Sequence, residues 1–207
     1  SDVRPTYSRE QSLPADAGKD MISRGLEWFF NGRFFIDPSW KKLQLERQGD
    51  GLMPVARALP ADSKVGNGSM GILEGHASNI YYDGEQDFRY WLRADVQGEV
   101  AFALAAGGKS LNNSTYEEVS KNLMEYVLKK SAFRAGKRID PSSPVYGLIG
   151  WSDTHPYVFY ADDNARLVLG LIGASAFMDY DRWNKEIIEN ILANFRLSNV
   201  NGFFGNG

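Results

Sequence analysis

Two adjacent carboxylates, Asp162 and Asp163, open a long uncharged stretch of the sequence. Arg166 follows them, and the next charged residue is Asp179. On a helix, Asp162 and Arg166 lie one turn apart on one face, whereas Asp163 points about 100° away from its neighbour. Both carboxylates suit a helix N-terminus because of the helix dipole, but one ion pair cannot serve both. Two alternatives follow: both only stabilise the helix, or one of them faces a ligand.

Paired carboxyl groups are the chemistry of glycoside hydrolysis, in which one acts as an acid and the other as a base or nucleophile. Asp162 or Asp163 is the predicted first partner. Asp95 and Glu74 are the candidates for the second. In an inverting enzyme the two carboxyl groups stand about 6.5–9.5 Å apart, which leaves room for a water molecule.

Asp95 belongs to a second charged group that also contains Arg93 and Glu99. Asp95 and Glu99 are four residues apart, so on a helix they share a face and repel one another. A cation or a hydrogen-bonding ligand would relieve that repulsion. The alternative, which we favour, is that Arg93 or Arg166 neutralises the two carboxylates.

Glu74 and the segment WSDTHPY supply the other candidates. Glu74 lies between Leu73 and a glycine in a predicted β-hairpin, where the alternative is an ordinary turn residue. The segment contains Trp151, His155 and Tyr157 just before an apolar helix, on the same side as Asp162. Trp151 is the best candidate for stacking on a sugar ring, because indole offers a large flat apolar face. The alternative is a core tryptophan.

The composition narrows the classes of function. A net charge of -3 provides no basic surface for a phosphate backbone, so nucleic acid is not an expected partner. No apolar run is long enough to span a bilayer. The absence of cysteine and the presence of only two histidines argue against a thiolate or histidine-rich metal site. We expect no metal or cofactor, and a carboxylate site for a hard cation is the alternative. Residue 1 is not Met, and we expect that a signal peptide has been removed, which predicts a periplasmic or secreted protein.

The apolar pattern predicts mostly helices. Residues 15–31 carry apolar side chains at helical spacing, and residues 91–107 and 157–178 are apolar almost all round, which is typical of buried helices. Each buried helix is followed by an amphipathic one, over residues 114–133 and from Asp181 onward. Residues 1–14 are expected to be irregular, residues 33–70 a long loop region, and the final segment NGFFGNG a connecting loop.

Local signals predict where these elements begin and which way they face. Ser114–Glu117 matches a capping box, Asp181 is a reasonable N-cap, and Asp83-Gly84 marks the turn of a small β-hairpin near residues 71–85. In the last helix one set of residues is expected to face inward: Trp183, Ile187, Ile191 and Phe195. Another set is expected to face outward: Lys185, Glu186, Glu189 and Asn194.

The two helix pairs repeat at an offset of 67 residues. Ala94-Asp95 then falls on Ala161-Asp162, and Gln97 falls on Asn164. Both units consist of a buried helix, a short loop and an amphipathic helix. Such repeats bury a continuous core only when neighbouring units stack. We expect an inner layer of buried helices and an outer layer of amphipathic ones.

The segments LRADVQGEVAFALA and YADDNARLVLGLIGA resemble inner-helix openings of the six-hairpin glycosidase-like proteins, the (α/α)6 toroids. In particular, the chain resembles bacterial proteins of that group encoded by gut Bacteroidetes. The resemblance spans roughly residues 20–200. It implies an all-α domain of α-hairpin repeats that form part of an (α/α) toroid, with residues 1–207 as one incomplete domain. The alternative is a complete five-helix bundle. The resemblance also implies a cleft lined by the inner-helix N-termini, and an oligosaccharide or polysaccharide as partner.

The sequence therefore predicts a carbohydrate-active protein, with glycoside hydrolysis as the favoured activity. The expected catalytic residues are Asp162, Asp163, Asp95 and Glu74. The expected substrate-binding residues are Trp151, His155, Tyr157, Arg93, Glu99 and Arg166. A non-catalytic helical scaffold that binds a glycan or a protein is the first alternative. A polysaccharide lyase is the second, with His155, Tyr157 and Arg166 as its weaker candidates.

Overall fold

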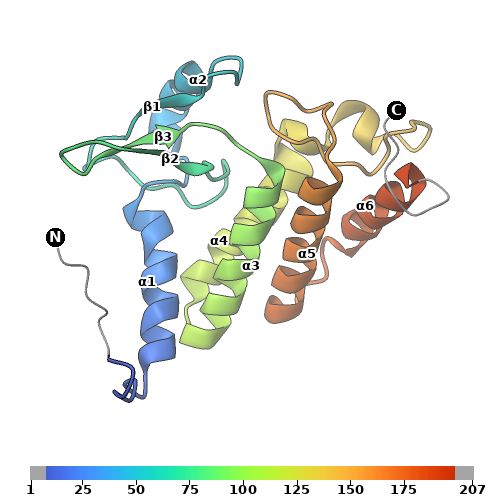
Figure 1. The fold of residues 1–207 in the computed structure, drawn as a ribbon. Coiled ribbons are helices and arrows are strands. Elements are labelled where there is room, and N and C mark those ends of the chain that lie inside the picture. The colour runs from blue at the N-terminus through green and yellow to red at the C-terminus, as the bar shows by residue number, and fades with distance from the viewer. Residues whose placement is uncertain (1–7, 199–207) are drawn as a thin grey trace.

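Three long helices stand in a row, and two further helices pack beside them (Figure 1). The computed structural model describes residues 8–198. The row consists of α1 (Ala17–Asn31), α3 (Ala94–Leu111) and α5 (Ala161–Met178). Helix α4 (Ser114–Glu125) packs on α3, and α6 (Asn184–Leu197) packs on α5. The chain is therefore mostly helical, and the two predicted helix pairs are present in the predicted order.

Helices α3 and α5 cross at very short range because glycines lie at the contact. A Cβ on Gly170 would lie 2.4 Å from the carbonyl carbon of Gly98, and a Cβ on Gly98 would lie 2.7 Å from the carbonyl oxygen of Leu167. One turn further along, the ring of Phe102 covers Gly173, where a Cβ would lie 2.7 Å from the ring. Helices α3 and α5 run in the same direction, and their N-terminal ends lie near one another (Figure 1).

The two units use the same hydrogen bonds at equivalent positions. In α3 the buried amide of Gln97 accepts from the backbone N–H of Ile72 (2.9 Å) and donates to the carbonyl of Ile72 (2.8 Å). In α5 the buried amide of Asn164 accepts from the N–H of Ile149 (3.1 Å) and donates to the carbonyl of Ile149 (3.0 Å). We call these two sets of bonds the amide clamps. They confirm the 67-residue repeat and tie each preceding connection to its inner helix.

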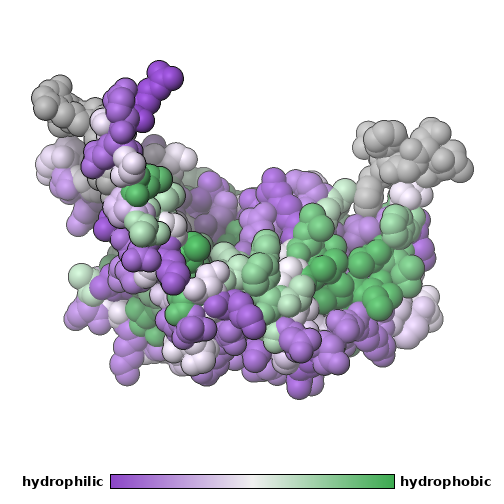
Figure 2. Space-filling model, turned by 90° about the horizontal axis from the view of Figure 1, so that it is seen from below, coloured by the Kyte–Doolittle hydropathy of each residue, from purple (hydrophilic) through white to green (hydrophobic). Residues whose placement is uncertain are grey.

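Helix α6 shows a different buried face from the predicted one. Trp183 and Ile187 are buried as expected, but Phe195 is 69% exposed. Glu189, predicted to face outward, instead pairs with Arg134 at 2.5 Å. The prediction for these two side chains was wrong because α6 packs on α5 and on the 134–147 segment, which shifts its buried stripe. Figure 2 shows hydrophobic side chains gathered on the right, over this end of the molecule.

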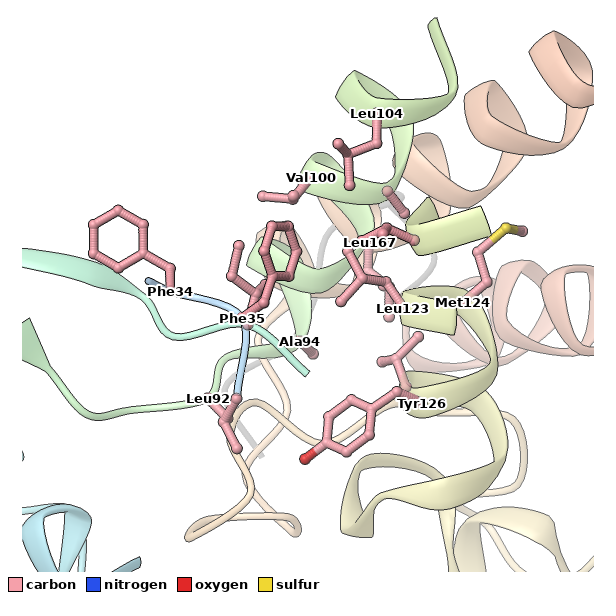
Figure 3. Close-up of a cluster of buried hydrophobic side chains, with 14 of the residues drawn as sticks. Phe34, Phe35, Leu92, Ala94, Val100, Leu104, Leu123, Met124, Tyr126 and Leu167 are labelled. Carbon is pink, nitrogen blue, oxygen red and sulfur yellow. The ribbon is translucent and has the colours of Figure 1, made fainter. Parts of the chain in front are cut away.

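The core lies where the inner helices meet α4 and the segment after α1. Phe35 points toward α3 from the left and Leu123 from the right, with Leu167 of α5 close by (Figure 3). These three side chains are fully buried. The apolar stripe predicted for residues 114–133 is buried throughout α4 and the turn after it: Tyr116, Val119, Leu123 and Val127.

The segment between α1 and α3 contains more structure than predicted. It holds a short helix, α2 (Lys41–Gln48), and a three-stranded antiparallel sheet made of β1 (Val55–Arg57), β2 (Gly75–Ile80) and β3 (Gln86–Arg89). Strand β3 is central, so the predicted hairpin is real, but β1 is added along its other edge. The prediction that residues 33–70 form a loop region was wrong. Helix α2 has few apolar residues and β1 spans only three residues, so neither gives a clear apolar pattern in the sequence.

Several predicted helix ends also require correction. Helices α3 and α5 begin at Ala94 and Ala161, a few residues later than expected. The capping box is wrong: Asn113 is the N-cap of α4, and its side chain accepts from the N–H of Thr115. Asp181 does not cap α6, which begins at Asn184.

Short helical turns account for the remaining predicted helix. Helix α4 does not continue to Phe133 as an α-helix; a π-helical turn and two 3-10 turns follow it, over Tyr126–Lys130, Ala132–Arg134 and Gly136–Ile139. Another 3-10 turn, Pro38–Trp40, precedes α2. The predicted connecting loop at 201–207 and residues 1–7 of the predicted irregular start lie outside the described residues. Among residues 8–198, no helix is both long and apolar enough to cross a bilayer.

Substituting Gly170 by Ala is expected to destabilise the protein by about 1–3 kcal/mol, because the added methyl group meets backbone atoms that cannot move aside cheaply. The matched control is Gly25→Ala in α1, where an added Cβ has nothing within 4 Å. That change should stabilise by roughly 0.5–1 kcal/mol through helix propensity. Urea unfolding measures both. Equal stability of the two variants would show that the α3–α5 crossing is not tight.

Candidate functional site

The loop before α5 is joined to the start of α3 by backbone hydrogen bonds. The N–H of Ala94 donates to the carbonyl of Trp151 (3.0 Å), and the N–H of Asp153 donates to the carbonyl of Leu92 (3.3 Å). Ala94 is the first residue of α3, so its N–H has no acceptor within the helix. The carbonyl of Trp151 is that acceptor, and the bond fixes the loop beside the N-termini of α3 and α5.

A network of charged side chains occupies these N-termini, and we call it the Arg93 cluster. Its centre is Arg93, whose Nη2 donates to Asp163 Oδ1 at 2.7 Å and to Asp95 Oδ2 at 3.0 Å. Arg166 of α5 approaches the same Asp95 oxygen at 3.3 Å. One guanidinium thus links the carboxylates of both inner helices. The cluster consists of Glu74, Arg89, Arg93, Asp95, Asp163 and Arg166.

Glu74 joins the cluster from the segment that leads into the sheet. Its carboxylate lies 3.6 Å from Arg93 Nη1 and 3.4 Å from the Nε of Arg89 on β3. The N–H of Glu74 donates to the carbonyl of Trp91 (2.8 Å), which fixes the backbone beside α3. Glu74 is therefore not an ordinary turn residue, and three of the four predicted catalytic carboxylates lie around one arginine.

Burial dominates the electrostatics of Asp95. Its side chain is only 3% exposed, and this burial raises the pKa of Asp95 to about 6. The charge of Arg93 opposes the rise, whereas the charge of Asp163 adds to it. A carboxyl group with a pKa near 6 exists in both protonation states close to neutral pH, which is what acid–base chemistry requires.

Aromatic side chains form a wall beside the cluster. Trp151 packs edge-on against Trp91 (ring centroids 4.7 Å apart) and against Tyr160 (5.3 Å). The guanidinium carbon of Arg93 lies 5.9 Å from the centre of the Trp151 ring. His155 completes the wall, with its Nδ1 at 2.9 Å from the Thr154 hydroxyl. Trp151 therefore lies beside Arg93, and His155 packs behind it against the two indole rings.

Three of the predicted site residues, Asp162, Glu99 and Tyr157, lie away from these contacts, whereas Arg166 belongs to the cluster. Asp162 and Glu99 are exposed, and Arg166 pairs with Asp95 rather than with Asp162 as the helical spacing suggested. Tyr157 lies over the guanidinium of Arg138, with 4.4 Å from the Arg138 guanidinium carbon to the ring centre. The favoured alternative for Asp95, neutralisation by Arg93 or Arg166, is confirmed, since both arginines contact it.

Sequence reasoning missed several residues that shape the site. Arg89 and Trp91 flank the entry to α3, and Tyr160 is the residue just before α5. Asp153 lies in the WSDTHPY segment, where its carboxylate accepts from Gln48 of α2 (2.8 Å) and burial raises its pKa. The position of Tyr160 two residues before Asp162 was the one available signal. The others depend on contacts between distant segments.

Within residues 8–198, no three His, Asp or Glu side chains are placed to hold a metal ion. The cluster instead sets three carboxylates against three guanidinium groups. Comparison with protein-family models, with curated proteins and with solved structures gives no match. The argument for function therefore rests on the geometry of this site.

The raised pKa of Asp95 predicts a pH-dependent stability. Between pH 4 and pH 6 the folded state holds the Asp95 proton more tightly than the unfolded state, so stability falls as pH rises through this range. Asp95→Asn imitates the protonated form and lacks this loss. The difference in unfolding free energy, parent minus variant, should decrease by up to about 3 kcal/mol from pH 4 to pH 7. Urea titrations at each pH measure it, and a constant or rising difference would contradict the prediction.

Proposed function

We propose that this chain is carbohydrate-active and hydrolyses glycosidic bonds at the Arg93 cluster. The observation that carries the proposal is the buried Asp95 carboxyl, with a pKa of about 6, held beside the Asp163 carboxylate. Asp95 is the proton donor to the leaving oxygen, because it holds a proton near neutral pH. Asp163 is the second carboxylate, and Trp151 provides the face on which a sugar ring stacks.

The spacing of the carboxylates bears on stereochemistry. One oxygen of Asp95 and one of Asp163 both lie within 3.0 Å of the same Arg93 nitrogen, so these two oxygens are no more than about 6 Å apart. This spacing suits a retaining mechanism, in which the carboxyl groups stand about 5–5.5 Å apart, better than an inverting one. Glu74, which lies at the other terminal nitrogen of Arg93, is the candidate partner at longer range.

Asp95 also distinguishes hydrolysis from the two alternatives. A scaffold that only binds glycans needs aromatic side chains and hydrogen bonds, but it has no need of a carboxyl group that titrates near pH 6. The candidate lyase residues contact different side chains and are not brought together. Tyr157 stacks on Arg138, and Arg166 pairs with Asp95. Hydrolysis is therefore the better-supported activity. The periplasmic or secreted location stays a prediction of the sequence.

The adjacent aspartates provide a matched test of the proposed hydrolysis. Asp163→Asn alters a carboxylate bonded to Arg93, whereas Asp162→Asn alters its exposed neighbour. With xylan, mannan and pectin as substrates, we expect the parent to release reducing sugar from at least one. Asp95→Asn and Asp163→Asn should lower that release at least about 100-fold, because each removes a group that acts in the transition state. Asp162→Asn should leave it unchanged.

Glycan-array binding by the same variants separates the outcomes. Binding retained by Asp163→Asn while release is lost supports hydrolysis. Binding without release by the parent would establish the scaffold instead, and neither binding nor release would overturn the proposal. Equal loss in Asp162→Asn and Asp163→Asn would also count against it, because Asp162 lies outside the cluster.

We also propose that the two units belong to an (α/α) toroid, in which a further α-hairpin covers α5. On α3 the positions that meet α5 include Gly98 and Phe102. At the 67-residue offset they correspond to Ala165 and Leu169 of α5, which are exposed, with Leu169 66% exposed. The stripe continues through Ile172, which is 43% exposed. The outer face of α5 thus has the apolar pattern of a contact face.

Two further observations support this arrangement. A groove of about 460 Å³ between α5 and α6 is lined mainly by apolar side chains, among them Ile172, Ile188 and Ile191. Asp95 contacts α5 through Arg166, and Asp162 occupies the equivalent position on the uncovered side of α5. In that arrangement Asp162 would contact the further α-hairpin, just as Asp95 contacts α5 through Arg166.

An uncovered apolar face is expected to cause weak self-association. Sedimentation velocity should show association that increases with protein concentration and that Leu169→Glu weakens, because a charge on an apolar contact face is costly. The control is Leu52→Glu, which changes a leucine that is 73% exposed on a loop. If the two variants behave alike, the α5 face is not a contact surface.

A further inference from the structure

A second hollow lies on the opposite face of the sheet from the Arg93 cluster. We call it the Trp28 groove; it has a volume of about 650 Å³, within the range of small-molecule sites. It lies between the end of α1, the 57–61 segment and the β2–β3 hairpin. Phe88 of β3 faces this groove, whereas Arg89, the next residue, pairs with Glu74 of the cluster. Successive residues of a strand point to opposite faces.

The wall of the groove is a tryptophan held in place by other rings. Trp28 is 47% exposed, and its ring centre lies 4.8 Å from that of Phe34 and 5.8 Å from that of His76. Phe34 is almost fully buried. The indole is therefore a fixed, half-exposed aromatic face rather than a mobile surface side chain, and a ligand that stacks on it loses little entropy in ordering it.

His76 supplies polar atoms beside this aromatic face. Its ring packs against Phe34 (4.9 Å between centres) and Phe88 (5.3 Å), and burial lowers the pKa of His76. The neutral imidazole that results offers one donor and one acceptor. Gln86 adds an amide on the same face, anchored by its donation to the carbonyl of Ala77 (3.1 Å).

The charged residues around the groove are committed to other partners. Arg57 pairs with Glu85 (3.3 Å) and stacks on Tyr81. Arg33 donates to the carbonyls of Asn31 and Ala61, which ties the end of α1 to the opposite wall. Neither arginine stands ready to neutralise a phosphate or carboxylate, so the groove favours an uncharged ligand.

We propose that the Trp28 groove binds a neutral sugar ring. A pyranose has a flat C–H face that suits an indole and a polar edge of hydroxyl groups that suits His76 and Gln86. A nucleobase could stack equally well, but a nucleotide would also need a cation for its phosphate. The inference goes beyond the proposed function, because binding here needs no chemistry at Asp95 or Asp163.

Fluorine NMR of protein labelled with 5-fluorotryptophan tests the inference, since the chain has only 5 tryptophans and substitution assigns each signal. The probes are cellohexaose, xylohexaose and mannohexaose, with adenosine for comparison. We expect at least one hexasaccharide to shift the Trp28 signal saturably, both in the parent and in Asp163→Asn. The affinity at this site, followed by the groove resonances of His76, should fall at least about tenfold in Trp28→Ala.

Two controls keep the test decisive. Trp28→Phe retains an aromatic ring against Phe34 if Trp28→Ala does not fold, and it should weaken binding by a smaller factor. Trp91→Phe alters a tryptophan near the cluster and should leave the Trp28 response unchanged. The inference is overturned if no hexasaccharide shifts the Trp28 signal, if only Trp151 or Trp91 responds, or if adenosine alone binds. Hydrolysis lost in Asp163→Asn with the Trp28 response retained separates the two sites.

Discussion

The close crossing of α3 and α5 at Gly98 and Gly170 brings together the carboxylates that these two helices contribute to the site. The two helices run in the same direction and touch backbone to backbone, and their N-terminal turns lie side by side. Asp95 comes from one helix and Asp163 from the other, and a single guanidinium can reach both only at this separation. A larger residue at either glycine would move the two carboxylates apart as well as loosen the core.

The positive charge of Arg93 offsets the repulsion between these carboxylates. Carboxylates brought together in a protein interior repel one another and lose their hydration, so they need a cation with several donors. The planar guanidinium of Arg93 offers donors toward three carboxylates at once, which a lysine ammonium could not do in the same geometry. The compensation is incomplete for Asp95, where burial outweighs the arginine and keeps the proton affinity high. The raised pKa of Asp95 thus arises from burial that Arg93 only partly compensates.

The sequence predicted the elements with strong periodicity and the residues next to them. Both helix pairs, their repeat and the buried stripe of α4 could be read because apolar spacing is a local signal. The pairing of Asp163, rather than Asp162, with α3 could not be read, since it depends on which side of α5 is covered. The third strand, helix α2 and the joining of Glu74 to Arg89 were missed for the same reason. Each is set by contacts between segments far apart in the chain, and neither α2 nor β1 is apolar enough to be visible alone.

The amide clamps have a consequence for how the connections can vary. Ile72 comes from the long segment that contains the sheet and Ile149 from the shorter segment after α4, yet both are held by the same pair of bonds. The clamp fixes one residue of each connection and leaves the remainder free to differ in length and content. Helices α3 and α5 thus hold two unrelated connections by the same pair of hydrogen bonds. A different connection could replace either one without changes in the helices, provided that it keeps the residue bonded by the amide clamp. The connections that precede α3 and α5 are therefore the part of this fold most open to functional change.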